Sequence, residues 1–149
     1  SFYISADGQY SELLHIPAGG SAMPSSESTV RDRLHFMKMA GKEVFKVAVT
    51  KMSEAFEKAI ASSPFSPEDV ALFIPHQANM RIIDAVARRL NFPLEKTYVN
   101  VHKYGNISAA TTIVALDEAI EEGRVKKGDI VSLVAFGGGF TWGAAILKL

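Results

Sequence analysis

One histidine and one asparagine stand where the sequence indicates chemistry. His76 follows the apolar run 70–74, and Pro75 marks the end of a strand because it forces the preceding residue out of the helical region. Asn106 lies in a second turn, 103–108, that also comes directly before an expected helix. Loops that leave strand ends in α/β sheets commonly carry the functional side chains of such folds. We therefore expect His76 and Asn106 to meet in space.

Both side chains could serve as neutral hydrogen-bond donors. Histidine can also exchange a proton or bind a metal, whereas the asparagine amide donates without changing its charge near neutral pH. Each residue also has an ordinary interpretation, since a lone histidine is more often structural and Gly-Asn is common turn chemistry. The four histidines show no i,i+4 pair, and no Asp or Glu spacing suggests ligands, so we expect no metal site.

Composition limits the classes of function. A chain of 149 residues with 48% hydrophobic and 21% charged residues is typical of one ordinary domain with a real core. Its formal net charge is zero, which gives no bulk attraction to nucleic acid or anionic membranes. It has no cysteine, which excludes disulfides, thiolate metal sites and a thiol nucleophile within the chain. We find no transmembrane run and no signal peptide, and we expect a cytoplasmic protein.

The elements that must position the two side chains alternate between strands and helices. The pattern predicts an α/β fold with a mixed five-stranded sheet, because strands separated by helices favour parallel pairing. The last two strands are close enough in sequence to pair antiparallel. We expect helices on both faces and an exposed Gly-, Ser- and Pro-rich loop at 18–29. The expected strands are 2–5, 12–16, 70–74, 97–100, 130–136 and 140–149, and the expected helices are 41–61, 79–90 and 108–122.

The helix at 41–61 has the strongest periodic signal in the chain. Phe45, Val49, Met52, Phe56 and Ile60 recur at steps of three and four, which is typical of a helix buried on one face. Several further apolar residues widen that stripe. One sheet face would not cover all of it, so we expect an apolar face of this helix to remain exposed for another layer of protein.

Three motifs together closely resemble a known enzyme family. They are Ile-Pro-His-Gln-Ala-Asn-Met-Arg at 74–81, Tyr-Gly-Asn-Ile-Ser-Ala-Ala-Thr at 104–111 and Ala-Phe-Gly-Gly-Gly-Phe-Thr-Trp-Gly at 135–143. In this order they resemble the C-terminal half of β-ketoacyl-acyl carrier protein synthase III, which starts bacterial type II fatty-acid synthesis. The resemblance covers nearly all of residues 1–149. It implies one half of a thiolase-like fold, in which two similar halves pack about a pseudo-twofold axis.

The resemblance implies roles for particular residues. His76 and Asn106 match the His and Asn of the family's Cys-His-Asn triad, which stabilise the negative charge that forms when malonyl-acyl carrier protein loses CO₂. Gly138 matches the glycine whose N–H holds the oxyanion on the acyl-Cys, and Phe136 matches the aromatic wall of the malonyl pocket. The pantetheine tunnel and the carrier-protein docking site are implied at Gly41, Ala78 and Asn79, and at Arg81, respectively.

The triad cysteine has no counterpart in this chain. The resemblance places it in an N-terminal half, so we expect the chain alone to be inactive as an acyltransferase. It implies a CoA thioester such as acetyl-CoA and acyl carrier protein as substrates, and a homodimer as the complete enzyme. Two alternatives remain open, a non-enzymatic carrier-protein or acyl-binding module and a secondary-metabolite ketosynthase. Lys42 stands where some members have Asn, which is a departure on the tunnel wall.

Overall fold

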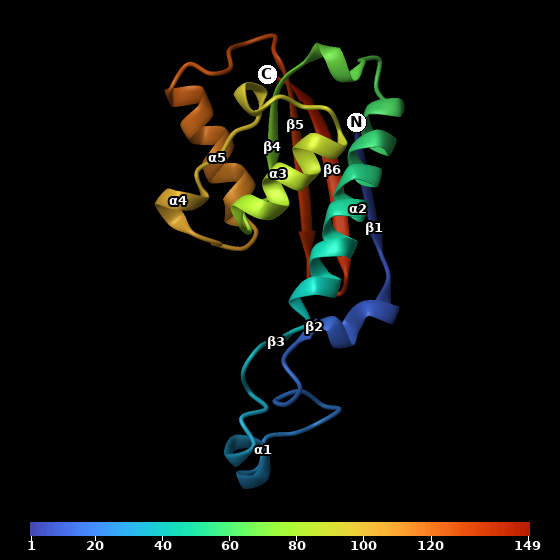
Figure 1. The fold of residues 1–149 in the computed structure, drawn as a ribbon, viewed down its shortest axis with the longest axis vertical. Coiled ribbons are helices and arrows are strands. Elements are labelled where there is room, and N and C mark those ends of the chain that lie inside the picture. Colours follow the sequence, from blue (N-terminus) through green and yellow to red (C-terminus); the bar gives the residue numbers. More distant parts are fainter.

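A mixed four-stranded sheet forms the centre of the computed structural model, which describes all residues 1–149 (Figure 1). The strand order is β1-β6-β5-β4, with β4 parallel to β5 and β6 antiparallel to both of its neighbours. The expected antiparallel pairing of the last two strands is confirmed. The strands are β1 (Phe2–Ala6), β4 (Val70–Pro75), β5 (Ile130–Gly137) and β6 (Thr141–Lys148).

Helices cover both faces of this sheet, as the sequence predicts. The long helix α2 (Gly41–Ala61) and the helix α3 (Met80–Arg89) lie across one face, where 19 buried residues form the larger core (Figure 1). The helix α5 (Ala110–Glu121) covers the other face over a smaller cluster of seven buried residues. Central strands covered on both faces read as nearly continuous apolar runs, which explains the composition of β4 and β5.

The aromatic side chains of the larger core fix how the helices sit on the sheet. Phe73 of β4 stacks on Phe92 at 4.9 Å between ring centroids, and Phe56 of α2 meets both rings edge-on. Such pairs add to the free energy gained from area burial alone. These contacts hold β4 against α2 and against the segment that follows α3, and His76 comes directly after the carboxyl end of β4.

The predicted count of five strands in the sheet is wrong. Residues 97–100 form only a single parallel bridge, between Phe73 and Thr97, and the Tyr98 N–H donates to the Phe73 carbonyl at 2.9 Å. Pairing stops there because the next backbone N–H groups bond to a side chain instead. Asn100 and Val101 both donate to the Gln77 amide oxygen, and a short helix α4 (Val101–Tyr104) begins.

The expected strand at 12–16 also differs from the structure. Its first two residues end a 3-10 helix η1 (Gly8–Leu13), and only the next two form a strand, β2 (Leu14–His15). The β2 strand pairs with β3 (Lys38–Met39) in a separate two-stranded ladder rather than joining the main sheet. Two further single turns of 3-10 helix are η2 (Pro67–Asp69) and η3 (Leu94–Lys96).

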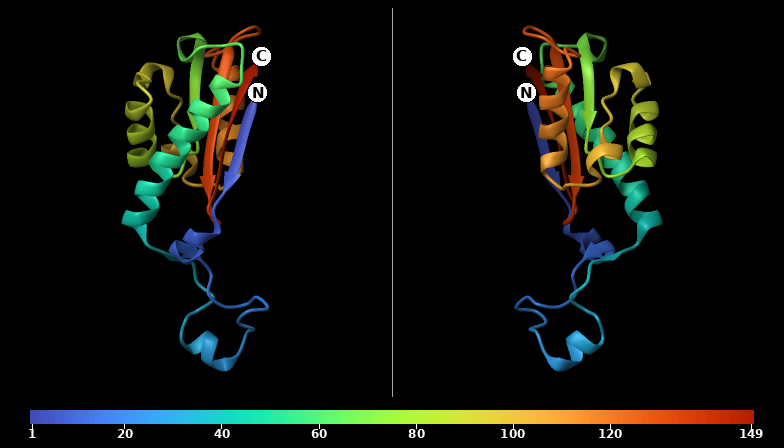
Figure 2. Two further views of the ribbon diagram at one scale, coloured as in Figure 1. Left: turned by 90° about the vertical axis from the view of Figure 1, so that its right-hand side faces the viewer. Right: turned by 90° about the vertical axis from the view of Figure 1, so that its left-hand side faces the viewer.

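The segment between β2 and β3 extends away from the rest of the molecule (Figures 1 and 2). Much of the expected loop at 18–29 is exposed, and it leads into a short helix α1 (Glu27–Arg31) capped by the Ser26 side chain. Met37 and Phe36 leave most of their side-chain surface in solvent. This part of the chain makes little core of its own.

The prediction that helix 41–61 exposes an apolar face is wrong, because the exposed apolar side chains lie on other elements. The apolar stripe of α2 packs against β6, β5, β1, α3 and η1, which together cover more of the helix than one sheet face would. The large exposed apolar side chains lie elsewhere, for example Phe2 and Ile4 on β1, which are 72% and 73% exposed, and Ile113 on α5. None of the helices combines the length and the apolarity that crossing a bilayer requires.

Candidate active site

His76 is held by its backbone and by one side-chain contact. Directly after β4, its N–H donates to the Val134 carbonyl of β5 at 2.7 Å, which ties the turn to the sheet. Its Nδ1 lies 2.6 Å from the Thr111 hydroxyl in the first turn of α5. Burial lowers the pKa of His76 below its ordinary value, so the imidazole is neutral at neutral pH.

The Thr111 contact determines what His76 can do. A hydroxyl that donates to Nδ1 leaves the single imidazole proton on Nε2, because a neutral imidazole carries one N–H. The Nε2 atom has no hydrogen-bond partner within the chain. In this tautomer His76 therefore presents a neutral N–H donor to a ligand.

Asn106 is presented by an unusual turn. Gly105 adopts φ +68° and ψ −157°, a combination that is essentially restricted to glycine, and Ser108 has φ +59°. The Asn106 Oδ1 atom accepts the Ser108 N–H at 3.0 Å. Because this bond occupies the oxygen, the Nδ2 amide group is the part of the side chain left to donate to a ligand. The helix expected from residue 108 begins two residues later in the structure, at Ala110.

One cavity of about 730 Å³ contains both predicted donors. It lies where the ends of β4 and β5 meet the first turn of α5, as expected for the carboxyl ends of parallel strands. Four other residues that the sequence singled out also line it, namely Ala78, Asn79, Phe136 and Gly138. The structure therefore brings together six of the eight predicted site residues. Its walls are otherwise largely apolar, with Leu14, Met37, Val44 and Trp142 among them.

A second cavity of about 770 Å³ contains the remaining two predicted residues, Gly41 and Arg81. The two cavities share Asn79, so they are neighbours. Lys42 and Lys46 line the second cavity beside Arg81, whose guanidinium stacks over the Phe45 ring at 5.7 Å. Three cations on one wall favour an anionic ligand.

Asn79 has a structural contact of its own. Its Oδ1 atom accepts the Ile82 N–H at 3.0 Å, so the side chain is the N-cap of α3. The side chain of Asn79 is thus oriented by the helix it caps, and the residue lines both cavities.

Sequence reasoning missed two residues that support this site, Thr111, which lines the cavity, and Gln77, which does not line it. Thr111 is 35 positions from His76, and nothing in the local pattern pairs them. Gln77 is fully buried and makes four hydrogen bonds, to the carbonyls of Pro75 and Tyr98 and from the N–H groups of Asn100 and Val101. The only sign of its role in the sequence was its place beside His76 in the motif 74–81.

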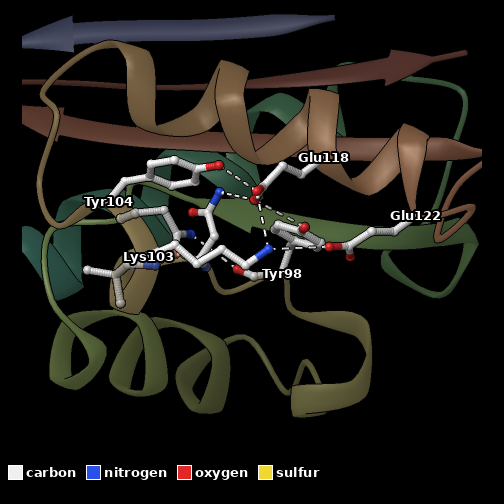
Figure 3. Close-up of polar contacts among 8 residues, drawn as sticks. Tyr98, Lys103, Tyr104, Glu118 and Glu122 are labelled. Atoms are coloured by element: carbon white, nitrogen blue, oxygen red, sulfur yellow. Dashed lines mark hydrogen bonds and ion pairs between the residues drawn. The ribbon is translucent and has the colours of Figure 1, made fainter.

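A third missed feature is the polar cluster around Glu118 of α5 (Figure 3). The Glu118 carboxylate accepts from Asn100 Nδ2 at 2.8 Å and from the Tyr104 hydroxyl at 2.7 Å, and Lys103 Nζ lies 3.2 Å away. The Asn100 amide, followed by the Tyr104 hydroxyl, lowers the pKa of Glu118 to about 2. No group of three or more His, Cys, Asp and Glu side chains is arranged to hold a metal ion.

Known proteins are similar to this chain in sequence and in architecture. Residues 60–149 match the family described as 3-Oxoacyl-[acyl-carrier-protein (ACP)] synthase III C terminal. The beta-ketoacyl-[acyl-carrier-protein] synthase III of Natranaerobius thermophilus is 53% identical over 148 residues, covering 99% of this chain and 45% of that protein. The chain thus spans about half the length of the curated relatives it matches.

Solved structures agree with the sequence relatives. The 3-oxoacyl-[acyl-carrier-protein] synthase III from Aquifex aeolicus is 44% identical with a TM-score of 0.85, and the match covers 99% of this chain and 43% of that one. The corresponding enzyme from Thermus thermophilus is 43% identical with a TM-score of 0.87, over 100% of this chain and 45% of that one. The expected thiolase-like α/β fold is confirmed, and the chain belongs to the C-terminal family of the 3-oxoacyl-[acyl-carrier-protein] synthase III proteins.

Proposed function

We propose that this chain supplies the decarboxylating donors of a condensing enzyme that initiates bacterial type II fatty-acid synthesis. The observation that carries the proposal is that His76 and Asn106 line one cavity, with His76 Nε2 and Asn106 Nδ2 as the side-chain atoms that have no partner within the chain. Each belongs to a side chain whose other polar atom already has a protein partner. Both donors are therefore oriented before any ligand arrives, which is the requirement for stabilising charge that develops during a reaction.

The proposed reaction develops negative charge that two such donors would stabilise. In malonyl-acyl carrier protein, the bond between the methylene carbon and the carboxylate breaks and CO₂ leaves. The electron pair moves through the methylene carbon onto the thioester oxygen, giving an enolate. Two neutral donors stabilise this oxygen without the desolvation cost of a buried cation. The lowered pKa of His76 keeps its ring neutral for this role.

The enolate carbon then attacks an acyl group, such as acetyl from acetyl-CoA, held as a thioester on cysteine. The carbon–carbon bond forms and gives a tetrahedral intermediate. When this intermediate collapses, the carbonyl is restored and the cysteine leaves as a thiolate. This chain contains no cysteine. We assign the nucleophile to a separate N-terminal half, so residues 1–149 act as the C-terminal half of the catalytic unit. The activity would be an acyltransferase activity that the chain alone lacks.

The other predicted residues fit further roles around the two donors. Gly138 would offer its N–H to the oxyanion on the acylated cysteine, and Phe136 would wall the malonyl group. The phosphopantetheine arm would run through the two neighbouring cavities, beside Gly41 and Asn79 in the second and Ala78 in the first. The cationic wall of the second cavity, with Arg81, suits the phosphate and an acidic acyl carrier protein.

These roles define the partners of the proposed enzyme. They are acyl carrier protein, an acyl-CoA, the cysteine-bearing half and a second copy in a homodimer. We assign the proposed reaction to the cytoplasm, where its CoA thioester substrate is made. The apolar side chains left exposed on β1 and α5 support a covering protein layer such as that half.

The proposal is tested by separating the two half-reactions in the natural protein that carries this chain together with its cysteine. His76→Ala and Asn106→Ala should each slow malonyl decarboxylation by about 10²–10³, the usual effect of losing one oxyanion donor. Acylation of the cysteine by acetyl-CoA should be affected far less, because no malonyl enolate forms in that step. Equal losses in both half-reactions would assign the two residues a structural role instead.

A further inference from the structure

The two proposed donors come from different parts of the chain, and one buried side chain connects those parts. Gln77 follows His76 directly, and its side chain is fully buried. Its Nε2 group donates to the Pro75 carbonyl at 2.7 Å, on the His76 side, and to the Tyr98 carbonyl at 3.1 Å. All of its hydrogen-bonding capacity points to backbone groups rather than to the cavity, which it does not line.

The other end of the Gln77 amide holds the start of α4. Its Oε1 atom accepts the N–H groups of Asn100 at 2.9 Å and Val101 at 3.2 Å. The α4 helix has no side-chain cap of its own at this end, so Gln77 caps it from another part of the chain. The helix has only four residues, and Gly105 and Asn106 follow it immediately. Gln77 thus connects the backbone beside His76 to the helical turn that carries Asn106.

A second side chain, from α5, also holds α4. Glu118 of α5 accepts from Asn100 and Tyr104, which stand at the two ends of α4, and pairs with Lys103 (Figure 3). A four-residue helix has too few internal hydrogen bonds to be stable alone. Its position is therefore set by these two side chains, Gln77 from the β4 end and Glu118 from α5.

We infer that Gln77 is a positioning residue that fixes Asn106 relative to His76 by capping α4, with Glu118 as the second anchor. The inference rests on the proposed function, because it names how the two enolate donors are kept at one oxygen. Two donors serve one oxygen only when their separation is fixed, and a displacement of about 1 Å can cost about 10² in rate. A fully bonded amide between the two loops supplies that constraint.

The test replaces Gln77 by methionine, which has a similar length and no polar atoms able to replace the four bonds. In the natural, cysteine-containing protein, Gln77→Met should lower malonyl decarboxylation by about 10- to 100-fold, with a smaller effect on cysteine acylation. In the Asn106→Ala background the same substitution should cost less than about twofold, because the residue through which Gln77 acts is already gone. A purely structural role predicts the same loss in both backgrounds, and that result would overturn the inference.

Amide hydrogen exchange gives a readout that does not depend on activity. The Gly105 N–H donates to the Val101 carbonyl, and the Ser108 N–H donates to the Asn106 side chain. Gln77→Met should accelerate exchange at these two amides and leave α2 protected. Ile60→Ala, a substitution in the main core at the far end of α2, is the matched control and should not affect them selectively. Unchanged exchange at Gly105 and Ser108 would overturn the inference.

A milder variant covers the case in which Gln77→Met does not fold. Tyr104→Phe removes one hydroxyl from the Glu118 cluster at a residue that is 46% exposed, so folding is retained. It should lower decarboxylation by about two- to fivefold, and this loss should also disappear in the Asn106→Ala background. If Asn106→Ala itself has no effect, the proposed function fails, while the exchange data still decide whether Gln77 holds the loop.

Discussion

Replacing Thr111 by valine should weaken catalysis through the tautomer of His76. The two side chains have nearly the same shape, so the substitution removes little except the hydroxyl that lies 2.6 Å from His76 Nδ1. Without it, the hydrogen bond that favours the imidazole proton on Nε2 over Nδ1 is lost. A typical net hydrogen bond contributes about 0.5–1.5 kcal/mol, which corresponds to a factor of about 2 to 13.

The expected loss is therefore about 2- to 13-fold in malonyl decarboxylation, well below the loss for His76→Ala. Thr111→Ser retains the hydroxyl and is the matched control, and it should keep most of the activity. Nitrogen-15 NMR of the imidazole gives an independent measurement, since it distinguishes a protonated ring nitrogen from an unprotonated one. In the unsubstituted protein Nε2 should carry the proton. A proton on Nδ1, or a Thr111→Val variant with an unchanged spectrum and rate, would refute the reasoning.

Three further predictions follow from other parts of the structure. Arg81→Glu should lower the use of carrier-protein substrates far more than that of CoA thioesters, measured as kcat/KM at low and high salt, and equal losses would indicate folding damage. The His76 ring should titrate below pH 6.5, because burial lowers its pKa, and a titration above pH 6.5 would contradict this. The neutral buried ring contributes its full stability above pH 6.5, and this contribution is lost as the pH falls through the folded-state pKa. His76→Gln should therefore make the free energy of unfolding, measured with denaturant, less sensitive to acid. Phe73→Ala should reduce the free energy of unfolding by about 3–5 kcal/mol, since its ring is fully buried against Phe56 and Phe92, and a loss below about 1 kcal/mol would contradict that packing.

Elements with a local cause were predictable from the sequence. The bounds of α2, residues 41–61, agree with the prediction because the apolar spacing lies within the helix and Ser62, Ser63 and Pro64 directly follow it. The turn at His76 follows for the same reason, since Pro75 and the apolar run before it are adjacent in the chain. The cavity location then follows from the rule for strand ends in parallel sheets.

Elements decided by distant contacts were not predictable. Residues 97–100 have the composition of a strand, yet the Gln77 amide, more than 20 positions earlier, takes two of the N–H groups that would follow in that strand. The Thr111–His76 contact spans 35 positions and leaves no periodic signal. The helix expected to begin at residue 108 begins instead at Ala110, because Ser108 adopts φ +59° and its N–H bonds to the Asn106 side chain, which makes it part of the turn.

The most direct test of the central claim is a crystal structure of the natural, cysteine-containing protein with a malonyl thioester analogue that cannot lose CO₂. The account predicts that the thioester oxygen lies within about 3 Å of both His76 Nε2 and Asn106 Nδ2. It also predicts that Thr111 remains bonded to Nδ1 and Ser108 to the Asn106 oxygen. An analogue bound with that oxygen facing away from both donors, or in contact with neither, would contradict the account.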